Sequence, residues 1–150
     1  MPALAGVVVL TLDQLTKRWA LDFLRDGRTV DLFWTLRLRL VENTGAAFSQ
    51  GEGLGPLIGL LVLGVVVVLA RIGAKTADPL ARVTVGAVIG GALGNLFDRA
   101  FRSDGGLLGG AVVDFIDLQW WPVFNLADSV VVVGAVVILW LGNQRGEHTA

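Results

Sequence analysis

The chain has 150 residues and a formal net charge of −1, and 54% of its residues are hydrophobic, with a mean hydropathy of +0.69. Soluble domains are nearer about 45–50% apolar and lack long uncharged stretches. The near-neutral charge gives no global field for nucleic acid, and the absence of cysteine excludes disulfides and thiolate metal sites. These properties predict an integral membrane protein with a single domain over residues 1–150.

Hydropathy predicts four membrane-spanning helices, at about residues 3–24, 54–71, 80–98 and 122–142. Each has roughly 18–22 residues, close to the ~20 that a bilayer core requires. Helices also satisfy their own backbone hydrogen bonds within lipid. The predicted fold is therefore an all-α bundle of four transmembrane helices. The N-terminus lacks the basic region and cleavage site of a signal peptide, so we expect it to remain as the first span.

The segment between the first two predicted spans, residues 25–53, carries a different pattern. Within it, Leu32–Asn43 alternates apolar and polar residues, which is typical of a strand. We expect a small β element on the membrane surface here, and we expect the whole segment to act as a lid or cradle. In the third predicted span, Gly86, Gly90 and Gly94 recur every four residues, which favours close contact between helices.

Following the four spans across the bilayer brings most of the polar residues to one face. They are Asn43, Asn95, Asp98, Arg99, Asp114, Asn125 and Asp128. In the first span, Asp13 and Lys17 lie four residues apart, a spacing that predicts an ion pair within the helix. Asp98 and Arg99 fit either an ordinary interfacial pair or a functional role, and the sequence leaves both open.

Asp114 and Asp128 are harder to explain as structural charges. No lysine or arginine lies between Phe115 and Gln144, and an unpaired buried carboxylate marks a functional site by default. With a span starting at Pro122, Asp128 would lie ~9 Å below its start. Two close carboxyl groups share one proton, and such a pair can activate water and protonate a leaving amine. Amide hydrolysis is one interpretation; a small proton-coupled transporter or channel subunit, or a packing scaffold, are the others.

Five motifs carry a family resemblance. They are DQLTKRW (13–19), ENTGAAFS (42–49), GGALGNLFDR (90–99), VVDFIDL (112–118) and FNLADS (124–129). In this order they resemble the lipoprotein signal peptidases, also called signal peptidase II. That family consists of multi-pass aspartyl peptidases of the bacterial cytoplasmic (inner) membrane.

The resemblance implies an enzyme that removes the signal peptide from a diacylglyceryl prolipoprotein, cutting before the lipidated cysteine. It implies that Asp114 and Asp128 are catalytic, that membrane lipid surrounds the protein, and that globomycin inhibits it. The supporting residues would be Asp13, Lys17, Asn43, Gly45, Asn95, Asp98, Arg99, Asn125 and Ala127. We expect no metal, no cofactor and no nucleic acid.

The orientation in the membrane depends on which argument is followed. Counting basic residues would put the polar face in the cytoplasm. The resemblance implies the opposite, with both termini cytoplasmic and the active site near the outer face. We follow the resemblance.

Overall fold

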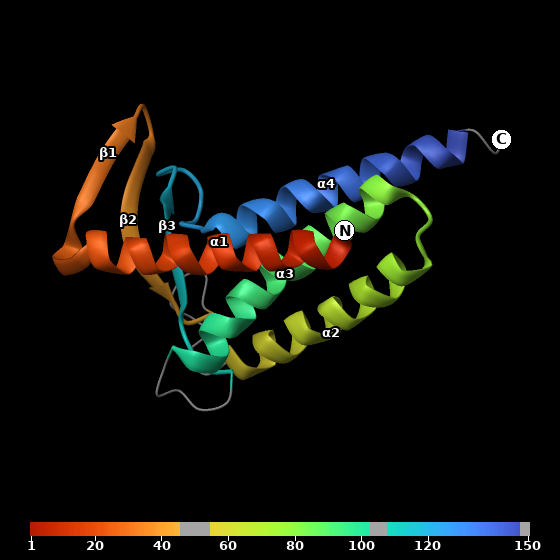
Figure 1. Ribbon diagram of the computed structural model, residues 1–150. Helices are drawn as coiled ribbons and strands as arrows, with labels where there is room; N and C mark the ends of the chain where they lie inside the picture. Colours follow the sequence, from red (N-terminus) through yellow and green to blue (C-terminus); the bar gives the residue numbers. More distant parts are fainter. Residues whose placement is uncertain (46–54, 103–107, 148–150) are drawn as a thin grey trace.

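The computed structural model describes residues 1–45, 55–102 and 108–147 of the chain. Its helices are α1 (Pro2–Phe23), α2 (Gly55–Lys75), α3 (Pro79–Phe101) and α4 (Leu126–Glu147), with a short 3-10 turn at Arg25–Gly27. Its strands are β1 (Thr29–Phe33), β2 (Leu36–Asn43) and β3 (Val112–Asp117). Figure 1 shows the sheet at one end of the helices, while the start of α1 and the end of α4 lie at the other end.

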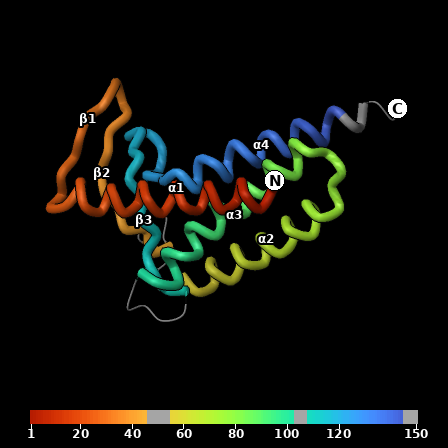
Figure 2. Tube along the Cα trace, viewed as in Figure 1, coloured from red at the N-terminus to blue at the C-terminus, as the bar shows by residue number. Residues whose placement is uncertain are grey.

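Helix α3 is the centre of the bundle, because it contacts each of the other three helices (Figure 2). The predicted close packing of its glycines is confirmed. A Cβ atom at Gly86 would overlap the backbone of Pro2, and one at Gly90 would overlap the backbone of Gly6. Helices α1 and α3 can therefore approach closely along the half that is remote from the sheet.

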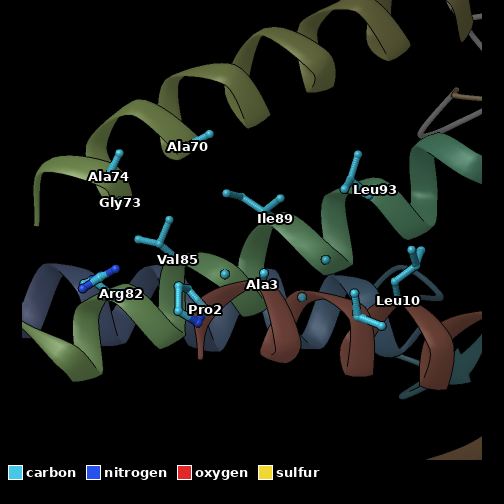
Figure 3. Close-up of a pocket in the computed structure, with 14 residues that line it drawn as sticks. Pro2, Ala3, Leu10, Ala70, Gly73, Ala74, Arg82, Val85, Ile89 and Leu93 are labelled. Atoms are coloured by element: carbon cyan, nitrogen blue, oxygen red, sulfur yellow. The ribbon is translucent and has the colours of Figure 1, made fainter.

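Helix α2 diverges from α1 and leaves an apolar cavity of about 400 Å³ between α1, α2 and α3. Figure 3 shows Arg82 at one end of this cavity, and Leu10 and Leu93 toward the other. The cavity lies away from the sheet, so it does not contribute to the polar site described below.

Within the described residues, three helical segments are long and apolar enough to cross a membrane: Gly55–Lys75, Pro79–Phe101 and Leu126–Gln144. The fold is thus mostly helical, and the expected fourth span is not confirmed by this criterion. The reason is the composition of α1, which also carries charges. They are Asp13, Lys17, Arg18 and Asp22.

The predicted β element exists, and it is larger than expected. β2 pairs antiparallel with β1 on one side and with β3 on the other. The predicted alternation holds, because Leu38 and Leu40 pack with Phe115 against the end of α1, whereas Arg37 and Arg39 both contact Asp117. The part of the predicted lid beyond Gly45, residues 46–53, lies outside the described residues.

Helix α4 begins later than the predicted span. Pro122 to Asn125 are not helical, and the helix starts at Leu126. Phe124 instead forms a backbone bridge to Ile116 of β3. The predicted depth of ~9 Å for Asp128 is therefore wrong: Asp128 lies in the first turn of α4. A carboxylate is favourable there, because the unpaired amides at the start of a helix carry partial positive charge.

Candidate active site

Asp128 is held by a reciprocal cap at the start of α4. The backbone amide of Asp128 donates to the side-chain oxygen of Asn125 at 3.0 Å, and the backbone amide of Asn125 donates to Asp128 Oδ2 at 3.2 Å. This is the arrangement of a capping box, in which the residue before the helix and the third helical residue satisfy each other. The cap fixes the direction of the Asp128 carboxylate. Its other oxygen, Oδ1, accepts a hydrogen bond from Asn95 of α3 at 2.7 Å.

Asp114 comes to the same place from β3. Its Cα pairs with that of Val41 in β2, just past an irregularity in the register between the two strands. The side chain of Asn43, also in β2, donates to Asp114 Oδ2 at 3.0 Å, and that of Asn125 donates to Oδ1 at 2.7 Å. Asp114 as a whole residue is only 2% exposed. The sheet therefore supplies one acid and the helix supplies the other.

The two acids share one neighbour and form no ion pair within the described residues. Asn125 bonds Asp114 through its side-chain amide and Asp128 through its backbone amide. In the described parts of the chain, neither carboxylate forms an ion pair with lysine or arginine. Neutral amide donors stabilise a carboxylate less than an ion pair does. The arrangement fits acids that must exchange a proton.

Burial raises the pKa of Asp114 to about 6, and the nearby charge of Asp128 adds to this rise against the hydrogen bonds from Asn43 and Asn125. Asp117, three residues along the same strand, has the opposite environment. Burial alone would raise its pKa, but the hydrogen bonds from Arg37, the Gln119 amide and Arg39 hold the pKa of Asp117 below its ordinary value. One strand thus carries an acid with a raised pKa and, three residues farther on, an acid with a lowered pKa.

A cluster of charged side chains with no net charge joins α1 to α3. Lys17, fully buried, lies 2.8 Å from Asp13 and 2.8 Å from Asp98, so the predicted ion pair is confirmed. Arg102 adds a second cation, 2.6 Å from Asp98. Two carboxylates and two cations balance, which makes this burial tolerable. Lys17 also donates to Asn95 at 2.7 Å, and Asn95 in turn donates to Asp128.

Ala127 and Gly45 contribute hydrogen bonds through their backbone amides. Asp13 accepts a hydrogen bond from the amide of Ala127 at 3.0 Å, so α1 also caps the start of α4. Gly45 has φ of +104° and donates its amide to the Asn43 side chain at 2.9 Å. Only glycine readily adopts this backbone conformation, and the turn orients the Asn43 side chain that bonds Asp114.

Arg99 is buried beside this site without a hydrogen bond to either acid in the described residues. Its charge interacts with those of Asp98, Asp114 and Asp128. Its hydrogen bond goes to the carbonyl oxygen of Gly110 at 3.4 Å. The interpretation of Asp98 and Arg99 as an ordinary interfacial pair is wrong, because both are buried and Asp98 pairs with Lys17 and Arg102.

The sequence reasoning missed Gln14 and Asp117. Gln14 donates to Asp98 at 3.1 Å and accepts from Arg102 at 3.3 Å, which closes the charge cluster. Gln14 stands between Asp13 and Lys17 in the sequence, and this position next to two charged residues was the signal that it could join the cluster. Asp117 is buried under two arginines at 2.8 and 3.0 Å; the alternation of Arg37 and Arg39 in β2 was the signal for it.

Comparison with solved structures defines the class of protein. A bacterial membrane enzyme solved by the in meso method at 2.3 Å resolution matches with a TM-score of 0.85 and 26% identity, covering 99% of this chain and 91% of that one. A second bacterial membrane enzyme, solved at 1.9 Å, matches with a TM-score of 0.79 and 27% identity over 93% and 90% of the two chains. The fold is therefore that of a bacterial membrane enzyme.

The sequence comparisons give the family. The profile described as signal peptidase (SPase) II matches residues 5–142. The lipoprotein signal peptidase of Rhodococcus jostii is 48% identical over 92% of this chain and 69% of its own length. That of Mycobacterium tuberculosis is 45% identical over 91% of this chain and 67% of its own. The chain belongs to the signal peptidase II family and is a peptidase of the bacterial membrane; the transporter alternative is not supported.

Proposed function

We propose that this peptidase is of the aspartic type, with Asp114 and Asp128 as its catalytic pair. The observation that carries the proposal is that one residue, Asn125, hydrogen-bonds both carboxylates, while no basic residue pairs with either in the described chain. Proteases that use serine or cysteine need a basic partner for the nucleophile. This chain has no cysteine, its single histidine, His148, is in the C-terminal tail, and its buried lysine, Lys17, is ion-paired with Asp13 and Asp98.

In the proposed reaction, the two acids hold one proton between them. The ionised Asp128 accepts a proton from a water molecule, and the resulting hydroxide adds to the scissile carbonyl carbon. Asp114, whose raised pKa keeps it protonated more readily, gives its proton to the carbonyl oxygen. Collapse of the tetrahedral intermediate breaks the C–N bond: the proton taken up by Asp128 passes to the leaving amine, and one hydroxyl proton of the intermediate returns to Asp114 as the new carboxyl group forms. The pair ends with one proton, as it began.

The proposed substrate is a diacylglyceryl prolipoprotein, cut before its lipidated cysteine. The names of the relatives, lipoprotein signal peptidases, support a prolipoprotein. The position of the acids supports a lipid-linked one, since Asp128 lies in the first turn of an apolar helix. A peptide bond close to a lipid anchor would arrive at this depth of the membrane. Membrane lipid is therefore a partner, and we expect globomycin to inhibit the enzyme.

We further propose that residues 1–150 form a single domain with four spans in the inner membrane, in which α1 crosses the bilayer together with α2, α3 and α4. The 22 residues of α1 would extend about 33 Å, and its two innermost charges, Asp13 and Lys17, neutralise each other. Both termini would be cytoplasmic, and the sheet and acids would lie near the outer face with segment 25–53 beside them. A reporter fused after Ala150 tests this orientation: activity only inside the cell supports it, and activity outside contradicts it.

The test of the function is cleavage by purified enzyme of a prolipoprotein with and without its diacylglyceryl group. We expect cleavage of the lipidated form only, with a product whose mass places the lipidated cysteine at the new N-terminus. Globomycin should block it. Equal cleavage of the unlipidated form would contradict the proposed substrate, and an uninhibited reaction would contradict the expected sensitivity to globomycin.

A further inference from the structure

A second polar region adjoins the buried charge cluster at Gln14 and Arg102. It is a groove of about 750 Å³ between α1 and the C-terminal part of α3. Figure 1 shows that these two helices diverge toward the end that carries the sheet. None of Asn43, Asp114, Asn125 or Asp128 lines the groove, so it is separate from the proposed active site.

The two ends of the groove differ in polarity. Its charged lining residues are Arg18 and Asp22 in the last two turns of α1, Arg25 just beyond α1, and Arg102 just beyond α3. Phe101 lies beside Arg102, and farther into the bundle the lining is uncharged and includes Leu10, Leu15 and Phe97. Phe101 is 74% and Leu15 59% exposed on the protein surface. In a bilayer these side chains would face acyl chains, and the arginines would lie at headgroup depth.

The charges at the polar end are not balanced. Arg25 pairs with Asp22 at 2.7 Å, and Arg102 pairs with Asp98 of the buried cluster at 2.6 Å. Arg18 is exposed, and it forms no ion pair with any residue that the structure describes. The groove therefore presents excess positive charge above an apolar surface. Guanidinium groups in this setting bind phosphate, because their paired N–H groups match its oxygens.

We propose that this groove binds an anionic phospholipid, with its phosphate against Arg18, Arg25 and Arg102 and an acyl chain along Phe97 and Phe101. An uncharged diacylglyceryl group would leave Arg18 without an ionic partner among the described residues, so charge favours a phospholipid over the substrate's own lipid. The position also has a consequence for the enzyme. Arg102 touches Asp98, and the contacts continue through Lys17 and Asn95 to Asp128, so a bound phosphate would adjoin the network that supports the acids.

Native mass spectrometry of the detergent-solubilised protein can measure this binding. Phosphatidylglycerol should bind more tightly than phosphatidylcholine or diacylglycerol with the same acyl chains. The double variant Arg18→Gln/Arg25→Gln should bind phosphatidylglycerol about 30-fold more weakly, since each basic residue near a charged lipid surface contributes about five-fold. Arg71→Gln, on α2 and outside the groove, is the matched control and should leave the affinity unchanged.

Asp22→Asn provides a test in the other direction, because it removes the carboxylate of the groove and should tighten binding several-fold. The proposal is overturned if phosphatidylcholine or diacylglycerol binds as tightly as phosphatidylglycerol, or if the double variant and Asp22→Asn both bind like the unmodified protein. Displacement of the lipid by an equal concentration of inorganic phosphate would also overturn it, since the groove would then recognise phosphate alone. None of these measurements depends on peptide cleavage.

Discussion

The side-chain amide of Asn125 donates a 2.7 Å hydrogen bond to Asp114, eleven residues earlier in the chain and on a different element. The same asparagine precedes α4 and caps it through Asp128. One side chain therefore performs two tasks: it starts a helix, and it connects the acid of the sheet to the acid of the helix. Its second donor bond, 3.1 Å to Asn95, ties both to α3.

These two tasks can be separated by substitution. Serine caps a helix about as well as asparagine, whereas alanine does not, at a cost of roughly 1 kcal/mol. Neither serine nor alanine can donate the amide bonds to Asp114 and Asn95. We expect Asn125→Ser to unfold at a higher temperature than Asn125→Ala, while both lose at least about 10-fold in cleavage rate.

Thermal unfolding followed by tryptophan fluorescence and cleavage of a lipidated prolipoprotein supply the two measurements. If Asn125→Ser retained the full rate, the amide bridge between the acids would have no catalytic importance. If both variants unfolded at the same temperature, the cap would contribute nothing.

The catalytic assignment predicts the effect of removing either carboxylate. Asp114→Asn and Asp128→Asn keep the size of the side chain, so we expect folded, membrane-inserted proteins. The cleavage rate should fall at least about 100-fold in each, the usual contribution of a general acid or base. Asp26→Asn is a matched control, since Asp26 is exposed and has φ of 60°, which asparagine also tolerates. Near-normal turnover by either catalytic variant would exclude an aspartic mechanism.

The raised pKa of Asp114 predicts how the reaction depends on pH. If Asp114 supplies the proton, the reactive form of the free enzyme is lost as the pH rises through about 6. The value of kcat/KM should then fall about 10-fold per pH unit well above that point. Measurements between pH 5 and 9 on the lipidated substrate would reveal it. A rate that rises through the same range would assign the ionised form of Asp114 to the reaction instead.

The same group should make the stability of the protein depend on pH. The pKa of Asp114 is about 6 in the folded protein and 3.8 when unperturbed, so the folded state binds more protons between these values. Stability therefore falls as the pH rises from about 4 to 6, by at most about 3 kcal/mol, and the loss is complete above that range.

Asp114→Asn does not lose stability in this way, because the asparagine side chain does not ionise. The unfolding temperature of the variant, minus that of the unmodified protein, should increase from pH 4 to pH 6 and then remain level. A difference that is constant with pH would show that Asp114 is not held in a strained, ionised state.

The sequence was sufficient to find the acids, but it did not reveal how they meet. The absence of basic residues around Asp114 and Asp128 marked both as unusual, and the structure brings them to one shared neighbour. Strand β3 was not predicted, because Val112–Asp117 has only six residues and five of them are buried, so no alternation distinguishes it. Its identity as a strand comes from pairing with β2, a contact between distant segments that local pattern does not contain.

The start of α4 was misplaced for a different reason. Apolar residues continue from Pro122 into the helix, so hydropathy gave no boundary. The capping signal was present at Asn125 and Asp128, which have the spacing of a capping box. The cap, more than the hydropathy, determines that Asp128 lies in the first turn and can reach Asn95.

The packing that holds α1 in place depends on a glycine of α3. A Cβ at Gly90 would overlap the backbone of Gly6, where neither helix can yield by rotating a side chain, whereas a Cβ at Gly64 of α2 meets nothing within 4 Å. Gly90→Ala should therefore destabilise the protein by about 1–3 kcal/mol, and Gly64→Ala should be neutral or slightly stabilising.

Because α1 carries both Asp13, which caps α4, and Lys17, which bonds Asn95, a displacement of α1 would also disturb the acids. Gly90→Ala should thus lose activity together with stability, although Gly90 is remote from Asp114. Unfolding temperature and cleavage rate measured in one detergent compare the two variants. Equal values for Gly90→Ala and Gly64→Ala would mean that close contact between α1 and α3 does not support the site.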